Sequence, residues 1–124
     1  MTTLDDETVR TLERHWEEGW NSRDLAMIMA PFAADVVFSS PGISIVTGDP
    51  NRSTIDGADA LRTYIANALR LTPALRYTRN ATYVGADSIV LVYDCVLPGR
   101  PPKPGADLMR VDRHGNVVEW RCHY

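Results

Sequence analysis

The sequence predicts a single α+β domain, with helices on one face of a curved sheet whose strands are antiparallel or mixed. Three observations predict this fold class. In the first part of the chain most apolar residues follow helical spacing. From residue 75 onward the chain consists mainly of strand-like segments, in which successive side chains alternate between two faces, joined by turns. The segment 88–97 is apolar on both faces, which is typical of a strand with cover on both sides. A length of 124 residues suits one hydrophobic core, so residues 1–124 are interpreted as one domain.

The first helix is predicted from one apolar stripe near the N-terminus. Its members follow one another after three or four residues and therefore share a helical face: Val9, Leu12, Trp16 and Trp20. Thr2 or Thr3 is expected to cap this helix, because either side chain can accept a hydrogen bond from a free backbone N–H group. The acidic residues 5–7 then lie at the positive end of the helix dipole, which stabilises them.

A polar break separates this helix from a second, shorter one. Residues 21–24 (Asn-Ser-Arg-Asp) stop the first helix and cap the next. The second helix is expected to bury apolar residues at helical spacing: Leu25, Ile28, Met29 and Phe32. Residues 35–40 change to a period of two, which predicts a strand with Val36, Phe38 and Ser40 on one face. A Pro-Gly pair ends this strand.

The middle of the chain is predicted to hold a short edge strand, a loop and a third helix. Residues 43–46 are interpreted as the edge strand and residues 48–53 as the loop, because turn-forming residues crowd the second of these segments. Thr54 or Asp56 is expected to cap the helix. Its buried face is predicted at helical spacing: Leu61, Tyr64, Ile65, Ala68 and Leu69. Pro73 closes it, because proline disrupts a helix interior.

The remainder of the chain is predicted to form two β-hairpins. Strands are expected at residues 75–84 and 88–97, and again at residues 106–111 and 117–124. The connection between the hairpins, residues 98–105, contains four prolines, which make it stiff and poor at strand pairing. The turn of the second hairpin holds a Gly-Asn pair that can adopt the positive φ of a tight turn.

The strand at residues 88–97 also predicts an oligomer. Because both of its faces are apolar, both need cover. The helices can cover only one face of the sheet. In so small a chain a second copy is the simplest cover for the other, so a homodimer through the outer face of the sheet is expected.

The composition argues against several classes of partner. The net charge is −3, and the 13 Lys and Arg residues form no basic stripe, so no nucleic acid is expected. No apolar run reaches the length of a membrane span, so no membrane is expected either. The first residues are acidic and lack the basic and apolar regions of a signal peptide, which predicts a cytoplasmic protein.

Cysteine and histidine usage gives no sign of a metal or redox site. Cys95 and Cys122 lie in strand-like segments and are interpreted as reduced core residues. His15, His114 and His123 lack the spacing of metal ligands. The sequence contains no phosphate-binding loop, so neither a cofactor nor a metal is expected.

Five short features are distributed along the chain: Trp16, the helix break at 20–24, the run 32–42, Gly57 and the segment 117–121. With the order of the predicted elements, these motifs resemble the nuclear transport factor 2-like superfamily, which includes the SnoaL-like polyketide cyclases and ketosteroid isomerase. The resemblance spans nearly the whole chain. It implies a cone, in which a bent sheet wraps around the N-terminal helices and a deep pocket opens between sheet and helices.

The resemblance also implies which residues line the pocket. Alternate residues of the first strand and of the later strands should point inward, and two tryptophans of the first helix should close the apex. The expected ligand-binding residues are Trp16, Trp20, Phe38, Ser40, Tyr93, Cys95, Met109, Trp120, Cys122 and Tyr124. An aromatic-rich, mostly apolar cavity with a few polar groups is the usual form of a small-molecule site.

The resemblance to ketosteroid isomerase implies one retained catalytic position. Ser40 stands where that enzyme has its carboxylate base, and Trp16 stands where it has a tyrosine donor. Asp107 matches its aspartic acid donor, so Asp107 is the candidate catalytic residue. Burial would raise the pKa of Asp107 and let it act as a general acid. A position at the open end of its strand would instead leave it a solvated carboxylate.

Two functions of different kinds follow. The first is binding of a small hydrophobic, cyclic metabolite, with cofactor-free isomerisation, cyclisation or dehydration in which Asp107 is the acid or base. The second is a non-catalytic ligand-binding or dimerisation module, which the missing carboxylate base favours. A closed cavity with Asp107 buried and unpaired would favour the enzyme, and an exposed Asp107 would favour the module.

Overall fold

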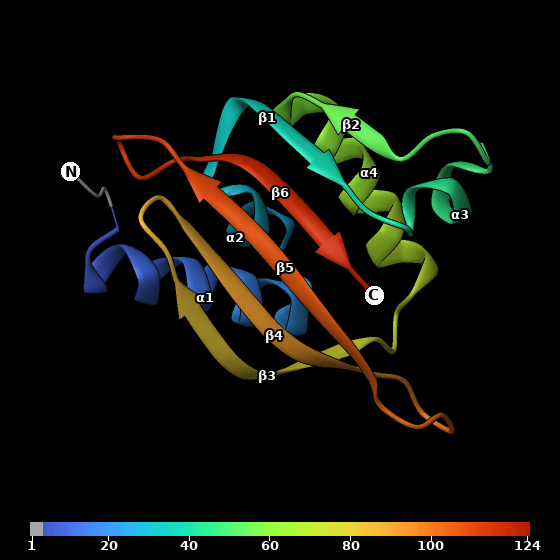
Figure 1. The fold of residues 1–124 in the computed structure, drawn as a ribbon. Helices are drawn as coiled ribbons and strands as arrows, with labels where there is room; N and C mark the ends of the chain where they lie inside the picture. The colour runs from blue at the N-terminus through green and yellow to red at the C-terminus, as the bar shows by residue number, and fades with distance from the viewer. Residues whose placement is uncertain (1–3) are drawn as a thin grey trace.

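The structure is a computed structural model that describes residues 4–124. Its helices are α1 (Asp6–Ser22), α2 (Leu25–Met29), α3 (Ile43–Thr47) and α4 (Ala58–Leu71). Its strands are β1 (Phe32–Ser39), β2 (Thr54–Asp56), β3 (Arg76–Val84), β4 (Ser88–Val96), β5 (Lys103–Val111) and β6 (Val117–His123) (Figure 1). The predicted α+β class is confirmed.

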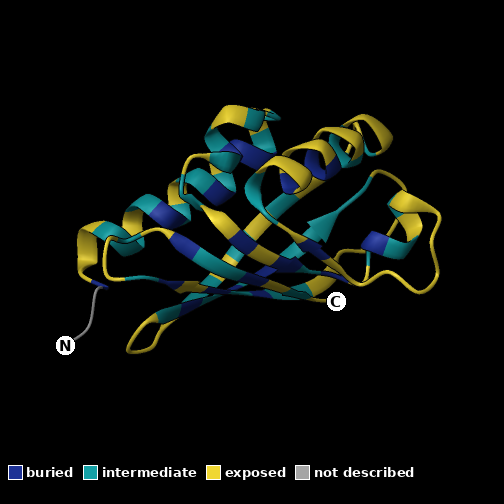
Figure 2. Ribbon diagram, turned by 90° about the horizontal axis from the view of Figure 1, so that it is seen from above, coloured by how far each residue is buried: buried dark blue, intermediate teal, exposed yellow. Residues whose placement is uncertain are grey.

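All strands belong to one six-stranded sheet in the order β2-β1-β6-β5-β4-β3. The β1–β6 pair is parallel and the other pairs are antiparallel, so the sheet is mixed. The helices lie on one side of this curved sheet (Figure 2). Buried residues gather between the two layers, which places the core and the cavity described below on the concave face of the sheet.

Helix α1 buries the predicted stripe. Leu12, Trp16 and Trp20 are buried, and the backbone N–H of Thr8 donates to the Asp5 carboxylate at 2.7 Å, which caps the helix. The cap expected from Thr2 or Thr3 lies outside the described residues. The helix ends at Ser22, and Arg23 after it adopts the left-handed conformation with φ 60°.

Two predictions for the middle of the chain are wrong. Residues 43–46 form part of helix α3, in which Ile43 is fully buried and Ile45 is 82% exposed. Their β-branched composition favours a strand, but β2 already pairs with the edge of β1 that they would need. Residues 54–56 form that strand and do not cap the third helix, which instead follows Gly57 at φ 90°.

Two strands begin earlier than expected. Phe32 starts β1 and does not belong to the second helix; its ring stacks on Trp120 with centroids 5.1 Å apart. Strand β5 starts at Lys103 and includes Pro104. Because β6 ends opposite Ala106, this first part of β5 has a neighbouring strand on one side only, where proline is tolerated.

A bulge in β3 turns one side chain inward. Between the flanking pairs of the β3–β4 ladder, Asn80 is an extra residue, so that Tyr77 lies opposite Cys95. Without the bulge, the register of residues 81–84 would extend along β3 and pair Tyr77 with Val96. The Tyr77 side chain would then lie on the outer face of the sheet. The bulge therefore directs the Tyr77 ring toward α1.

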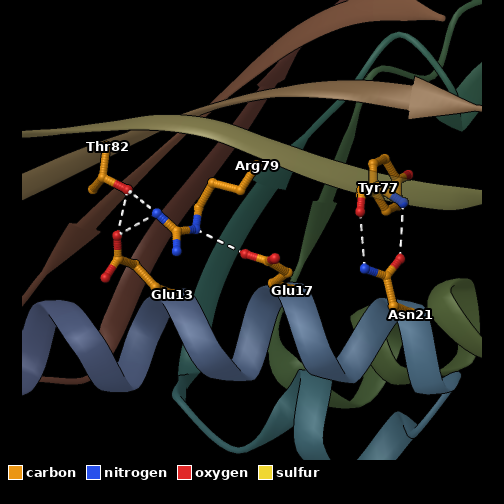
Figure 3. A network of polar contacts seen from close by, with 6 residues as sticks. All are labelled: Glu13, Glu17, Asn21, Tyr77, Arg79 and Thr82. Atoms are coloured by element: carbon orange, nitrogen blue, oxygen red, sulfur yellow. Dashed lines mark hydrogen bonds and ion pairs between the residues drawn. The ribbon is translucent and has the colours of Figure 1, made fainter.

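Polar contacts attach α1 to β3, an edge strand (Figure 3). The Asn21 amide donates to the Tyr77 carbonyl and accepts from the Tyr77 N–H, both at 2.8 Å. Beside it, Arg79 forms ion pairs with Glu13 and Glu17, each at 2.8 Å. Asn21 thus occupies the backbone groups of Tyr77 that an unpaired edge would expose.

The outer face of the sheet carries half-buried Val90, Val92 and Val96, and β3 ends in exposed Tyr83 and Val84. The homodimer through this face stays a prediction, which sedimentation at micromolar protein concentration tests directly.

Both cysteines are free thiols. Among residues 4–124, no helix combines the length and apolar character needed to cross a bilayer.

Candidate functional site

A cavity of about 210 Å³ lies between the concave face of the sheet, α1 and α4. It is lined by most of the residues expected from sequence: Trp16, Trp20, Phe38, Ser40, Tyr93, Asp107, Trp120, Cys122 and Tyr124. Cys95 and Met109 do not line it. Met109 is buried in the core, and Cys95 borders a separate hollow at the end of β4.

Aromatic rings form the walls of the cavity. Trp16 packs against Tyr93 and Tyr77 with ring centroids 4.9 and 5.2 Å apart. On the opposite wall Phe38 packs against Trp120 at 4.4 Å. Rings held this closely by one another keep their orientation, so the walls are preformed and mostly apolar.

Asp107 lies at one end of the cavity. Together with Trp16, Tyr93 and Trp120 it forms what we call the inner end. The Tyr93 hydroxyl donates to Asp107 Oδ1 at 2.8 Å. The indole N–H groups of Trp16 and Trp120 donate to Oδ2 at 3.1 and 3.0 Å. Asp107 is only 2% exposed, so the sequence-based condition for an enzyme is met in part: the carboxyl is buried, but it is hydrogen-bonded and not unpaired.

The electrostatics of the inner end favour the neutral carboxyl. Burial raises the pKa of Asp107, because the charged form loses its hydration. Hydrogen bonds from Tyr93, Trp120, Cys122 and Trp16 oppose this effect without reversing it. In the described part of the chain no Lys, Arg or His pairs with Asp107 to stabilise its charge. Asp107 therefore retains its proton to a higher pH than a surface aspartic acid does.

Gly105 explains how Tyr93 reaches Asp107. The two residues face each other across the β4–β5 ladder, and a Cβ atom at position 105 would lie 2.7 Å from the Tyr93 ring. Only glycine leaves room for the ring to lie across the strand. The Tyr93 hydroxyl can then extend to Asp107, two residues along β5.

Three hydroxyl groups cluster at the other end of the cavity. Their residues, Ser40, Tyr64 and Tyr124, form what we call the mouth. The Ser40 and Tyr124 hydroxyls are 2.7 Å apart, and the Gly42 N–H donates to Ser40 Oγ at 3.1 Å. Ser40 is buried, whereas Tyr124 is 47% exposed. Burial raises the pKa of Tyr64 and of Tyr124, so their hydroxyls remain protonated near neutral pH.

Cys122 lies between the inner end and the mouth. It faces Asp107 across the β5–β6 ladder, and its thiol interacts with Asp107 and Ser40. Burial and the neighbouring Asp107 raise the pKa of this thiol well above its ordinary value. Cys122 is therefore a neutral thiol and a poor nucleophile.

Sequence reasoning missed several lining residues. Tyr77 was missed because no sequence signal revealed the bulge that turns it inward. Tyr64 lies on the predicted buried face of its helix, but helical spacing does not distinguish a core residue from one that lines a cavity. Ile45 and Val46 line the cavity because residues 43–46 are helical, and the edge-strand prediction concealed this.

The histidines lie away from this site. His15 and His114 line a polar hollow beside the β5–β6 turn, and His15 Nδ1 lies 2.9 Å from the Met27 carbonyl. The His123 ring lies 3.3 Å from the Ala106 carbonyl. Within residues 4–124, no three His, Cys, Asp or Glu residues come together in a group that could hold a metal ion.

Comparisons with known proteins identify the family. The sequence model of the SnoaL-like domain matches residues 12–120. A crystal structure of a SnoaL-like protein of unknown function from Burkholderia thailandensis superposes with a TM-score of 0.82 at 28% identity, over 97% of this chain and 96% of that chain. No curated protein matches the chain.

More distant structures share the fold. A proposed polyketide cyclase from Sinorhizobium meliloti has a TM-score of 0.72 at 13% identity, over 90% of this chain and 93% of that chain. A proposed isomerase of the SnoaL-like family from Agrobacterium tumefaciens has a TM-score of 0.71 at 12% identity, over 94% of this chain and 96% of that chain. At these identities the likeness shows the fold alone.

Proposed function

Because the chain belongs to the SnoaL-like domain family, we propose that it binds a small, mostly apolar ring compound and changes it by cofactor-free isomerisation, cyclisation or dehydration. Asp107 is the acid or base of this reaction. The observation that carries the proposal is a buried carboxyl with a raised pKa at the inner end of an aromatic cavity. The names of two structural neighbours, a proposed cyclase and a proposed isomerase, fit the same reaction classes.

The size of the cavity limits the ligand. Its volume is about 210 Å³, whereas pockets for drug-sized ligands measure roughly 300–1,000 Å³ and an apolar cavity of about 150 Å³ holds one benzene. One ring or two fused rings fit inside such a space, and any larger part of a ligand would extend past the mouth.

Proton transfer would use one oxygen of Asp107. Oδ2 accepts two indole N–H groups, which occupy both of its lone pairs, so Oδ1, beside the Tyr93 hydroxyl, carries the proton of the neutral carboxyl. The neutral carboxyl would donate its proton from Oδ1 to a ligand oxygen. The carboxylate that forms is stabilised by the three donors around it, and it recovers the proton later in the reaction.

A specific observation favours the second candidate, a binding module without catalysis. Ser40 replaces the carboxylate base, and its alkoxide is inaccessible near neutral pH. Asp107 is also engaged by three donors, as a purely structural buried carboxyl would be. In this case the cavity holds the same ligand and releases it unchanged.

The test begins with native mass spectrometry of the protein as purified, to identify a retained ring compound. Turnover of that compound is then compared between the wild type and Asp107→Asn, which keeps the shape of the side chain. We expect a loss of turnover of about a hundredfold or more, because general acid–base catalysis contributes 10²–10⁴-fold. Asp35→Asn, which changes an exposed carboxyl of β1 outside the cavity lining, is the matched control and should keep most of the activity.

Two results separate the candidates. Turnover that is unchanged in a folded Asp107→Asn variant would remove the catalytic role. A compound that binds but is never converted by the wild type would establish the binding module instead. Near-ultraviolet circular dichroism of the tryptophans checks that the variant retains its fold.

A further inference from the structure

Lys103 stands beside the mouth of the cavity. Lys103 is opposite Cys95 in the β4–β5 ladder. Because directly opposite residues of antiparallel strands share a face, the two side chains lie on the same face of the sheet. The same alternation along β5 places Lys103 on the face of Asp107. Its ammonium lies 5.4 Å from the centroid of the Tyr124 ring, which is part of the mouth.

The charge of Lys103 is not neutralised by another side chain in the described part of the chain. Among residues 4–124, no carboxylate forms an ion pair with it. Its contact with the Tyr124 ring is a cation–π interaction, which orients the ammonium but does not neutralise it. Most arginines of the described residues also lack an ion pair, so the position of Lys103 beside Tyr124, and not the absence of a partner, distinguishes it.

Lys103 also lines a separate hollow. Its volume is about 410 Å³, and it is lined by Cys95, Leu97, Arg100, Lys103 and the neighbouring prolines. Figure 1 shows the β4–β5 loop and the end of β6 on the same side of the molecule. Arg100 adds a second positive charge, and no acidic side chain lines this hollow among the described residues.

We propose that Lys103 and Arg100 form an anion-recognition site beside the cavity mouth, so that the ligand is a one- or two-ring compound carrying a carboxylate or similar anionic group. The ring occupies the aromatic cavity, and the anionic group extends past Tyr124 to the two cations. This inference rests on the proposed ring-binding function and adds the charge of the ligand. Nothing in it depends on whether Asp107 is catalytic.

The hydroxyl groups of the mouth fit an anion as well. Tyr124 and Tyr64 remain protonated near neutral pH, so they can donate hydrogen bonds to an oxygen anion. The mouth therefore offers hydroxyl donors beside the two cations.

The test uses two probes with the same ring system, 2-naphthoate and 2-naphthol, titrated calorimetrically at pH 7 in low salt. We expect Lys103→Gln to weaken 2-naphthoate binding about fivefold and to leave 2-naphthol binding unchanged, since a solvent-exposed ion pair contributes up to about 1 kcal/mol. Arg100→Gln should have a smaller effect of the same sign. Raising the salt concentration should reduce the wild-type preference for the anion.

Arg113→Gln is the matched control. It removes the same charge from the β5–β6 turn, at the opposite end of β5, and should change neither affinity. Lys103→Arg keeps the charge and should restore most of the 2-naphthoate affinity.

The outcomes separate this inference from the function on which it rests. Binding of both probes with no selective effect of Lys103→Gln would overturn the anion site and leave ring binding intact. Equal loss in Lys103→Gln and Arg113→Gln would indicate only a long-range effect of net charge and would also overturn it. Failure of both probes to bind the wild type would overturn the ring-binding function and the anion site together.

Discussion

The two ends of the cavity use their polar groups in different ways. At the inner end, Asp107 is 2% exposed and receives hydrogen bonds from one hydroxyl and two indole groups. At the mouth, Tyr124 is 47% exposed, and within residues 4–124 the nearby ammonium of Lys103 contacts an aromatic ring but no carboxylate. The inner end is rigid and internally satisfied, whereas the mouth has capacity left for a ligand.

This difference separates chemistry from recognition. A buried carboxyl surrounded by neutral donors has an altered proton affinity, which suits proton transfer. An accessible cation beside hydroxyl groups suits the binding of an anionic group and its release. Stability measurements can test the contrast before any ligand is known, because a rigid end and an adaptable end respond differently to the same kind of substitution.

The largest expected effect comes from truncating a ring at the inner end. Trp120→Ala should lower the free energy of unfolding by about 3–5 kcal/mol, because Trp120 is 2% exposed and packs on Phe32 and Phe38. Tyr124→Ala at the mouth is the comparison and should lower it by less than about 1 kcal/mol. Urea denaturation measures both, and equal losses would contradict the contrast.

Two glycine substitutions test the same contrast at the backbone. Gly105→Ala should destabilise by about 1–3 kcal/mol, because the new Cβ would meet the Tyr93 ring at 2.7 Å and that ring is held by its neighbours. In Gly42→Ala the new Cβ atom would lie 2.6 Å from the Tyr124 hydroxyl, but this exposed side chain can move away. The free energy of unfolding should therefore fall by less than about 1 kcal/mol.

A double-mutant cycle checks the stated cause of the first effect. In a Tyr93→Ala background the new methyl group at position 105 has no ring to displace, so Gly105→Ala should then be nearly neutral. A full loss of stability in that background would assign the effect to the backbone of β5.

The pH dependence of stability tests the raised pKa of Asp107. A pKa that is higher in the folded state gives stability that is fully present below the unfolded-state pKa and is lost as the pH rises through the folded-state pKa. The free energy of unfolding of the wild type, minus that of Asp107→Asn, should therefore fall as the pH rises above about 4. The total fall should be about 1.4 kcal/mol for each unit by which folding raises the pKa of Asp107. Denaturant unfolding of both proteins at a series of pH values measures this difference.

Other carboxyl groups do not obscure that comparison. The pKa values of Asp5, Asp112 and Glu119 are lowered by hydrogen bonds, so their stabilising effects are lost as the pH falls. Both proteins contain them, and their contributions cancel. A stability difference that is independent of pH would contradict the raised pKa.

The smallest expected effect comes from removing single hydroxyl groups. Tyr93→Phe leaves a buried carboxyl oxygen of Asp107 without its donor and should destabilise by about 1–2 kcal/mol. Tyr124→Phe removes a hydroxyl that solvent can replace and should change stability by a few tenths of a kcal/mol. Thermal denaturation resolves the two, and a larger effect at Tyr124 would reverse the proposed contrast.

Much of the fold could be predicted from residue spacing. The stripe of α1, the helical face of α4 and the hairpins after residue 75 follow from periodicities that the structure retains. The candidate position of Asp107 came from a resemblance between motifs, and its burial agrees with the inward face assigned to it. The wrong assignments at residues 43–46 and 54–56 fall where two short segments compete for one strand edge.

The sequence by itself therefore determined which faces of the helices and strands are apolar, because a periodic pattern acts within a single element. Tertiary structure alone decided what lies across those faces. The bulge at Asn80 turns Tyr77 into the cavity, and the space above Gly105 lets Tyr93 reach Asp107. The strand pairing that begins at Lys103 brings a cation beside Tyr124. Each of these contacts joins residues far apart in the chain, so it depends on register and packing, which local periodicity does not encode.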